Sequence, residues 1–251
     1  MLAVVILAAG QGTRMKSPLP KVLHEAAGKP LLEHVLLAAA PLEAEHTVVV
    51  IGHKADEVRA RFTGVAAAAG VSWTVQREQL GTGHALLQTR EVLEPALAEG
   101  GSVLVVNGDG PLLRTETLRA LVTEQRVQGA GMTLLTCEVG DPTGMGRILR
   151  GDDGSVRRIV EEKDATPDER TVREINPGIY VFDTNVFELA GRLGNDNAAG
   201  EFYITDLVDL YLRAGYRVQA VRGGDETEVL GVNDPQQLAL IDGLLRARSE
   251  T

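Results

Sequence analysis

The chain has 251 residues, 44% of them hydrophobic and 24% charged, as in an ordinary globular protein. Its net charge of −10 argues against nucleic acid as a partner, because phosphate contacts need a basic face. A single cysteine, Cys137, excludes an intramolecular disulfide and fits a reducing cytoplasm, and no apolar run reaches the roughly 18 residues that span a bilayer. We therefore expect a cytoplasmic protein without nucleic-acid or membrane partners, in which any site for a polyanion is locally basic.

The first half of the chain alternates strand and helix patterns. The predicted strands are Leu2–Leu7, Thr47–Ile51, Val71–Val75 and Val103–Val106. The predicted helices are Pro30–Ala40, Asp56–Phe62, Gly83–Leu93 and Thr115–Val127. This alternation indicates an α/β, Rossmann-like, doubly wound fold around a mixed, mostly parallel sheet. Ligands bind such sheets at the carboxyl ends of the strands, so the loops that follow the strands are the candidate sites.

The second half is less regular. Its predicted strands are Met132–Val139, Arg147–Leu149, Val156–Val160, Gly178–Phe182 and Arg217–Val221. Its predicted helices are Asn185–Arg192, Ile204–Ala214 and Pro235–Arg248. No linker or repeat interrupts the pattern, so we expect a single domain over residues 1–251, in which residues 131–251 complete the sheet begun by residues 1–130 and cover the site.

The loop after the first predicted strand combines small residues with positive charge. Residues 7–15 read Leu-Ala-Ala-Gly-Gln-Gly-Thr-Arg-Met, and Arg14, Lys16 and Lys21 follow with no acid among them. Glycines let successive N–H groups turn toward phosphate oxygens. The loop lacks the third glycine of a dinucleotide fingerprint and the Gly-Lys-Ser/Thr of a P-loop. A merely flexible turn is the alternative, but it leaves the clustered cations unexplained, and the loop therefore predicts an anion site.

This loop, followed by Leu-Pro-Lys, resembles the signature of nucleoside-diphosphate-sugar pyrophosphorylases, and the resemblance runs over essentially the whole chain. The supporting segments are Gln-Leu-Gly-Thr-Gly-His-Ala (79–85), Pro-Thr-Gly-Met-Gly-Arg-Ile (142–148), Glu-Glu-Lys-Asp-Ala (161–165) and Gly-Glu-Phe-Tyr-Ile-Thr-Asp (200–206). The last segment is typical of the N-terminal part of the bacterial bifunctional N-acetylglucosamine-1-phosphate uridylyltransferases. The resemblance implies a fold of the nucleotide-diphospho-sugar transferase type, with residues 1–130 binding the nucleotide and residues 131–251 the sugar.

The resemblance also implies a reaction. N-acetylglucosamine 1-phosphate would attack the α-phosphorus of UTP in line, with Mg²⁺, to give pyrophosphate and UDP-N-acetylglucosamine for peptidoglycan and cell-wall synthesis. Alternatives are another product, such as UDP-glucose or dTDP-glucose, and a non-catalytic regulatory homologue that binds a nucleotide-sugar. The relatives trimerise largely through an acetyltransferase domain of hexapeptide repeats, and no such repeat occurs here. We expect a monomer or weak dimer, and a trimer if the chain is part of the longer bifunctional protein.

Roles for individual residues follow from the same resemblance. Arg14 and Lys21 are expected to be catalytic. The expected nucleotide-binding residues are Leu7, Ala8, Ala9, Gly10, Gln76, Gly81 and Thr82. The expected sugar-binding residues are Gly108, Gly146, Glu161 and Asn176. From the residues alone, Gly81 and Thr82 are equally typical of the start of a helix, and Thr205 is interpreted as a core or capping residue.

Two residues are expected to hold the metal ion. Asp109 follows the apolar strand Val103–Val106, and a carboxylate at the end of a parallel strand is well placed to bind Mg²⁺. The alternative for Asp109 is a turn-forming role. The resemblance adds Asn233 as the second ligand, although Asn-Asp-Pro also reads as a cap before the last helix.

Two positions depart from the family pattern. Pro177 separates Asn176 from Gly178 and restricts Asn176 to an extended backbone. Gly110 replaces a bulkier residue after Asp109 and loosens that turn. Neither change removes a reacting group.

Overall fold

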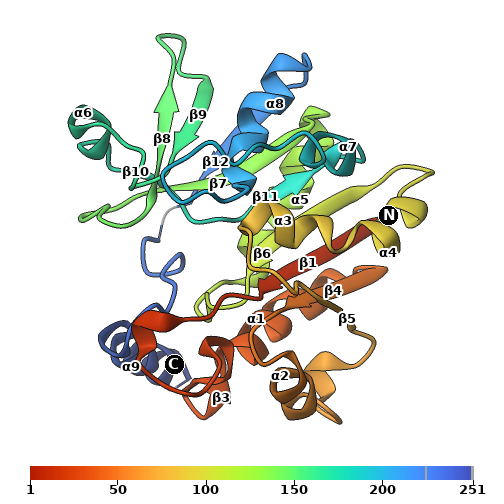
Figure 1. The fold of residues 1–251 in the computed structure, drawn as a ribbon, viewed down its shortest axis with the longest axis vertical. Coiled ribbons are helices and arrows are strands. Elements are labelled where there is room, and N and C mark those ends of the chain that lie inside the picture. Colours follow the sequence, from red (N-terminus) through yellow and green to blue (C-terminus); the bar gives the residue numbers. More distant parts are fainter. Residues whose placement is uncertain (224, 250–251) are drawn as a thin grey trace.

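The computed structural model describes residues 1–223 and 225–249 (Figure 1). In this part of the chain ten strands form one sheet in the order β5-β4-β1-β6-β11-β7-β10-β8-β9, and β12 pairs with β7 outside that path. The strands are β1 Leu2–Ala8, β4 His46–Ile51, β5 Ser72–Val75, β6 Ser102–Asn107, β7 Met132–Glu138, β8 Gly146–Arg150, β9 Val156–Val160, β10 Glu174–Asn176, β11 Tyr180–Phe182 and β12 Val218–Arg222. A separate short hairpin joins β2 Glu25–Ala26 to β3 Lys29–Pro30.

Helices cover both faces of this sheet. They are α1 Leu31–Ala39, α2 Ala55–Arg61, α3 Thr82–Leu87, α4 Arg90–Ala96, α5 Thr115–Gln128, α6 Pro167–Arg170, α7 Val186–Ala190, α8 Leu207–Arg213 and α9 Pro235–Ser249. Among the described residues, no helix is both long enough and apolar enough to cross a membrane.

The two faces of β1 pack into two different cores. Ala3 and Val5 share a buried cluster with residues of α3, α4, α7 and α8. Val4 and Ile6 share another with residues of α1, α2 and α5. A strand covered on both sides must be apolar at every position, which explains why the first strand reads as a continuous hydrophobic run.

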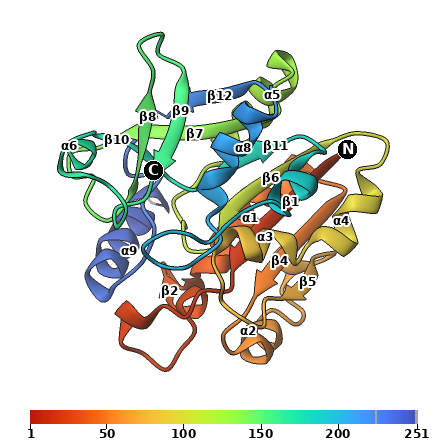
Figure 2. The same cartoon turned by 45° about the horizontal axis from the view of Figure 1, so that its top comes forward.

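Strand direction divides the sheet. β5, β4, β1 and β6 are mutually parallel, and β12 is parallel to β7. β11 runs antiparallel to both β6 and β7, so that β7 points the same way as β6. The β8–β9 hairpin and α6 lie at the far end of the molecule from β5 and α2 in both views (Figures 1 and 2). The predicted α/β fold with a mixed, mostly parallel sheet is confirmed.

Several local predictions differ from the structure, and the short β2–β3 hairpin was not predicted. The expected helix Gly83–Leu93 is divided into α3 and α4. At the division, the Gln88 side chain donates to the His84 carbonyl (3.0 Å) and the Thr89 hydroxyl donates to the Leu86 carbonyl (2.7 Å). Side-chain bonds of this kind compete with the backbone hydrogen bonds of a helix. Strand β10, of three residues, was not predicted. Helix α6 was also missed, although Thr166 and Glu169 form a capping box at its start.

The break between β10 and β11 shapes the site. Both segments run antiparallel along β7, with Ile175 opposite Cys137 and Tyr180 opposite Leu134. Pro177, in the gap, has no N–H to give to a ladder. Gly178 has φ +80°, a left-handed conformation that favours glycine. The gap is thus an irregularity in one long strand, of the kind that accompanies functional sites.

Replacing Gly178 tests how tightly this break is packed. A Cβ at Gly178 would lie 2.4 Å from Asn107 Nδ2, whereas a Cβ at Gly154, with φ +77°, would meet nothing within 4 Å. Gly154→Ala should lower the free energy of unfolding by about 1 kcal/mol through the left-handed backbone alone. Gly178→Ala should cost about 1 kcal/mol more, because the Asn107 amide must turn away from the new Cβ and lose its bond to the Pro177 carbonyl. Urea denaturation measures both, and equal losses would contradict the packing described here.

Candidate active site

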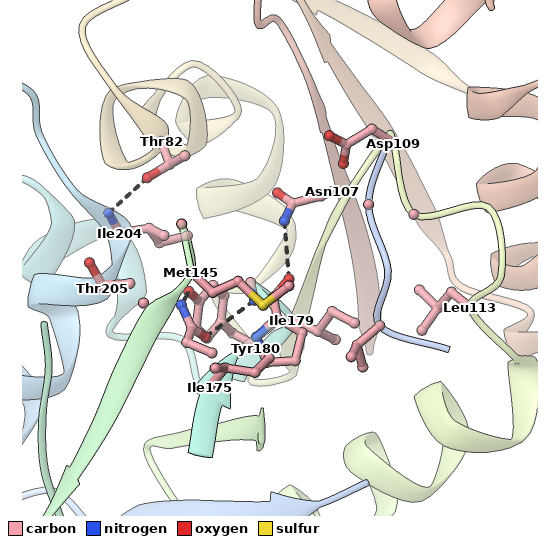
Figure 3. A pocket seen from close by; sticks show the side chains of 18 of the residues that line it. Thr82, Asn107, Asp109, Leu113, Met145, Ile175, Ile179, Tyr180, Ile204 and Thr205 are labelled. Atoms are coloured by element: carbon pink, nitrogen blue, oxygen red, sulfur yellow. Dashed lines mark hydrogen bonds between the residues drawn. The ribbon is translucent and has the colours of Figure 1, made fainter. Parts of the chain in front are cut away.

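Two cavities adjoin at the carboxyl end of β6. The larger, which we call the β1 cavity, has a volume of about 570 Å³ and is lined by the loop after β1 and the start of α3. The smaller, the β10 cavity, has a volume of about 260 Å³ and is lined by the β10–β11 break and the loop before β8. Thr82, Asn107 and Asp109 line both, and Figure 3 shows them on the side of the β10 cavity. The two cavities therefore meet where β6 ends, at the edge of the sheet that the strand pattern predicted for a ligand.

Most of the predicted site residues line these cavities. The β1 cavity is lined by Leu7, Ala8, Ala9, Gly10, Lys21, Gln76, Gly81, Thr82 and Asp109. The β10 cavity is lined by Thr82, Asp109, Gly146, Glu161, Asn176 and Asn233. Arg14 and Gly108 line neither. The Gly108 N–H donates to the Leu7 carbonyl (2.9 Å), so this residue lies between the ends of β6 and β1.

A polar network connects four predicted residues at the junction. The Lys21 ammonium forms an ion pair with Asp109 Oδ2 and lies 3.4 Å from Asn233 Oδ1. Arg14 Nη2 donates to the same Asn233 oxygen at 2.9 Å. The Lys21 and Asp109 side chains are only 16% and 18% exposed. We call these four residues the junction network.

The junction network contains a set of oxygen ligands that fits a cation. Asp109 and Asn233 direct oxygen atoms at one positive centre, which in this structure is the Lys21 nitrogen. Within residues 1–223 and 225–249, no cluster of three or more His, Cys, Asp or Glu side chains offers an alternative metal site. Mg²⁺ commonly binds one or two protein groups and completes its shell with phosphate oxygens and water.

Backbone contacts hold the network together. The Val232 N–H donates to the Asp109 carbonyl (3.0 Å), which places Asn233 beside the end of β6. Met15 and Val232 belong to one buried apolar cluster, so the neighbours of Arg14 and Asn233 in the sequence are packed together. Gly12 allows the close approach of Lys21, because a Cβ there would lie 2.6 Å from the Lys21 Cβ.

The structure separates the two interpretations of the Asn-Asp-Pro segment. Asp234 Oδ1 accepts hydrogen bonds from the N–H groups of Gln236 (2.9 Å) and Gln237 (2.8 Å) at the start of α9. The cap is thus Asp234, and the Asn233 side chain joins the junction network.

At the far end of the β1 cavity, Gln76 is buried. Its Nε2 donates to the Gly81 carbonyl (2.9 Å) and lies 3.0 Å from His84 Nδ1. Gly81 immediately precedes α3, and a Cβ there would lie 2.6 Å from the Phe202 carbonyl oxygen. Gly81 and Thr82 therefore start a helix and line the cavity as well. The start of a helix, one of the two interpretations made from the sequence, is confirmed, and nucleotide binding by these residues stays a prediction.

The β10 cavity contains a half-buried carboxylate, that of Glu161. Glu161 Oε1 accepts a hydrogen bond from the Thr205 hydroxyl (3.2 Å). Burial raises the pKa of Glu161, and the charges of Asp206, Asp164 and Glu201 act in the same direction. The interpretation of Thr205 as only a core or capping residue was incomplete: it is buried, but its side chain lies in this cavity (Figure 3).

Two further polar side chains line the β10 cavity. Asn176 Nδ2 donates to the Tyr180 hydroxyl (2.7 Å), and Asn176 Oδ1 accepts from the Gly178 N–H (3.2 Å). Asn107 Nδ2 donates to the Pro177 carbonyl (3.3 Å) between the two cavities. Sequence reasoning assigned no role to Asn107 or Tyr180. The signal for Asn107 was present, since it belongs to the same Asn-Gly-Asp turn as Asp109.

Known proteins resemble this chain at the level of sequence and of fold. The bifunctional protein GlmU of Thermus thermophilus is 50% identical over 248 residues, which are 99% of this chain and 52% of that protein. The GlmU of Pelobacter propionicus is 49% identical over 249 residues, 98% of this chain and 53% of that protein. The chain thus spans about half the length of the curated relatives it matches.

A solved structure extends the comparison of folds. A putative glucose-1-phosphate thymidylyltransferase from Bacillus anthracis, in complex with a sucrose, superposes with a TM-score of 0.77 over 98% of this chain and 96% of that one. Its sequence identity is 23%, so the likeness establishes the fold. The model of the MobA-like NTP transferase domain matches residues 4–198. The predicted recognition is confirmed, and the chain belongs to the family of MobA-like NTP transferase domains.

Proposed function

We propose that this chain is a nucleotide-sugar pyrophosphorylase that joins UTP to N-acetylglucosamine 1-phosphate and releases pyrophosphate. The observation that carries the proposal is the meeting of two cavities at the junction network. A reaction between two polyanions needs one cavity for each and positive charge between them. The network supplies that charge in a chain whose net charge is −10. The choice of UTP and an acetylated sugar is supported by the resemblance at residues 200–206.

The β1 cavity would take the nucleotide. Gln76 carries both a hydrogen-bond donor and an acceptor, as the edge of uracil requires. Its Nε2 is held by the Gly81 carbonyl, so its Oε1 would accept the N–H of the base. Lys21 and Arg14, in the junction network, would bind the phosphates of that nucleotide.

The chemistry needs no protein nucleophile, because the oxygen of the sugar phosphate is already anionic at neutral pH. The protein contributes position and charge. Arg14 would stabilise the departing pyrophosphate, and Lys21 would hold the phosphates in line. Asp109 and Asn233 would hold Mg²⁺, which would offset the negative charge that the two substrates bring together.

The β10 cavity would take the sugar. Glu161, Thr205 and Asn176 offer acceptors and donors that suit hydroxyl and acetamido groups. A carboxylate that is partly removed from water is unfavourable unless donors surround it. Sugar hydroxyls would supply donors to Glu161 in addition to the Thr205 hydroxyl.

Pyrophosphate release tests the proposal. Purified protein with UTP and Mg²⁺ should release pyrophosphate faster with N-acetylglucosamine 1-phosphate than with glucose 1-phosphate. Asp109→Asn should lower kcat by on the order of a hundredfold or more, because it removes charge at the point of reaction. Asp56→Asn, the same change on the exposed side of α2, should leave kcat unchanged.

Other outcomes would count against this assignment. A preference for glucose 1-phosphate would keep the reaction and overturn the sugar. Nucleotide-sugar binding without any release of pyrophosphate would favour a non-catalytic homologue. Equal losses of kcat in the Asp109→Asn and Asp56→Asn variants would show that Asp109 has no specific role in the reaction.

Glu161 should make the stability of the sugar-free protein depend on pH. Because burial raises its pKa above the ordinary value of 4.5, Glu161 stabilises the fold below that value and loses this contribution as pH rises through the raised pKa. Glu161→Gln cannot ionise. As pH increases from 4.5 through the raised pKa of Glu161, the free energy of unfolding of Glu161→Gln should therefore increase relative to that of the wild type.

Glu174→Gln is the control with the opposite sign. The Arg150 side chain lowers the pKa of Glu174, so the wild type should gain stability over Glu174→Gln as pH rises to 4.5 and above. Urea unfolding across this range measures both differences. A Glu161→Gln difference that does not change with pH would show that the pKa of Glu161 is not raised in the folded protein.

A further inference from the structure

Arg147, in β8, is almost completely buried, with a side chain 1% exposed. Removing a guanidinium from water is costly unless its charge and its N–H groups find partners. Its Nε has no hydrogen-bond partner among the described residues. The burial of Arg147 is therefore poorly optimised for stability, which suggests that the side chain serves the site beside it.

The hydrogen bonds of Arg147 lead to the loop before β8, one directly and the other through Glu162. Its Nη1 donates to the Met145 carbonyl, and its Nη2 donates to Glu162 Oε2 at 2.7 Å. The same Glu162 oxygen accepts the Gly144 N–H at 3.1 Å. The hydrogen bond from the Arg147 guanidinium lowers the pKa of Glu162. One charged pair thus anchors two consecutive residues of the loop.

This loop forms a wall of the β10 cavity. Gly144, Met145 and Gly146 all line it, and the Met145 side chain extends beside Tyr180 and Ile175 (Figure 3). Arg147 and Glu162 are themselves not among the lining residues. Their contact with the cavity is indirect, through the residues next to them in the sequence.

The pair also reaches the expected sugar-binding residues. Glu162 follows Glu161, and the two side chains lie apart, one at Arg147 and the other at Thr205 inside the cavity. A Cβ at Gly146 would lie 3.4 Å from Glu161 Oε1, so the end of the loop lies close to that carboxylate. Gly146 is also paired with Asn176 in the β8–β10 ladder.

We propose that Arg147 and Glu162 are a positioning pair that fixes the sugar side of the β10 cavity, by holding Gly146 and Glu161 in place for a sugar 1-phosphate. The proposal rests on the proposed function in one respect, the placement of the sugar in this cavity. The planar guanidinium bonds two acceptors at once, which a lysine ammonium cannot do in the same geometry. UTP would bind in the β1 cavity, which contains neither residue of the pair.

Steady-state kinetics on matched variants tests the pair. Arg147→Met should raise KM for the sugar 1-phosphate by on the order of tenfold or more, with KM for UTP unchanged, since a small displacement of positioning groups is costly. Arg147→Lys should recover only part of the loss. Arg147→Met combined with Glu162→Gln should raise the sugar KM no further than the larger single change, because the two residues act as a unit.

Arg150→Met is the control variant. Arg150 lies three positions along the same strand and pairs with Glu174 (2.6 Å and 2.7 Å), outside both cavities. Arg150→Met loses an ion pair, as Arg147→Met does. Its KM values for UTP and for the sugar 1-phosphate should nevertheless stay at the wild-type level. An equal rise in the sugar KM for both arginine variants would show a general structural effect and overturn the proposal.

Hydrogen exchange gives a readout that does not require turnover. The Gly144 amide, which donates to Glu162, should exchange faster in Arg147→Met and at the wild-type rate in Arg150→Met. If the wild type releases no pyrophosphate with any sugar 1-phosphate, the proposed function fails. Separately, a Gly144 amide that stays as protected in Arg147→Met as in the wild type would overturn the positioning role. If Arg147→Met does not fold, Arg147→Lys and Glu162→Gln carry the same test. An active Arg147→Met with unchanged sugar KM contradicts the inference.

Discussion

The Lys21 ammonium joins three segments that are far apart in the sequence, and the geometry of the site depends on it. It pairs with Asp109 at the end of β6 and lies within reach of Asn233 at the start of α9, while Arg14 bonds Asn233 from the same loop as Lys21. Both charged groups of the ion pair are largely removed from water, so removing either one would leave the other poorly compensated. Backbone contacts hold the Lys21–Asp109 pair in place, above all the hydrogen bond from the Val232 N–H to the Asp109 carbonyl.

This arrangement reconciles an acidic protein with a proposed reaction between two polyanions. The cations are concentrated where the β1 and β10 cavities meet, whereas the acidic groups Asp206 and Asp164 lie near Glu161 in the β10 cavity. The proposed division of labour follows from this placement. One cavity offers hydrogen bonds to a base, the other offers hydrogen bonds to a sugar, and the junction offers charge to the phosphates.

The sequence predicted the parallel part of the fold well, because strands buried on both faces leave unbroken apolar runs. It also predicted that Lys21 and Asp109 lie in loops at the same edge of the sheet, which follows from parallel strand order. The proximity of Asn233 came only from the resemblance to a family, because no periodicity links residues 212 positions apart. The β10–β11 break and the place of Thr205 depend on tertiary packing. The Arg147–Glu162 pair could not be predicted from the sequence either, since charged residues in a strand are ordinarily exposed.

A crystal structure with bound UDP-N-acetylglucosamine and Mg²⁺ tests the central claim, that the two cavities are the two halves of one reaction site. The account predicts uridine beside Gln76 in the β1 cavity, the acetylated sugar beside Glu161 in the β10 cavity, and the diphosphate at the junction network with Mg²⁺ on Asp109 and Asn233. A product molecule whose diphosphate lies away from Lys21, or whose sugar lies outside the β10 cavity, would contradict it.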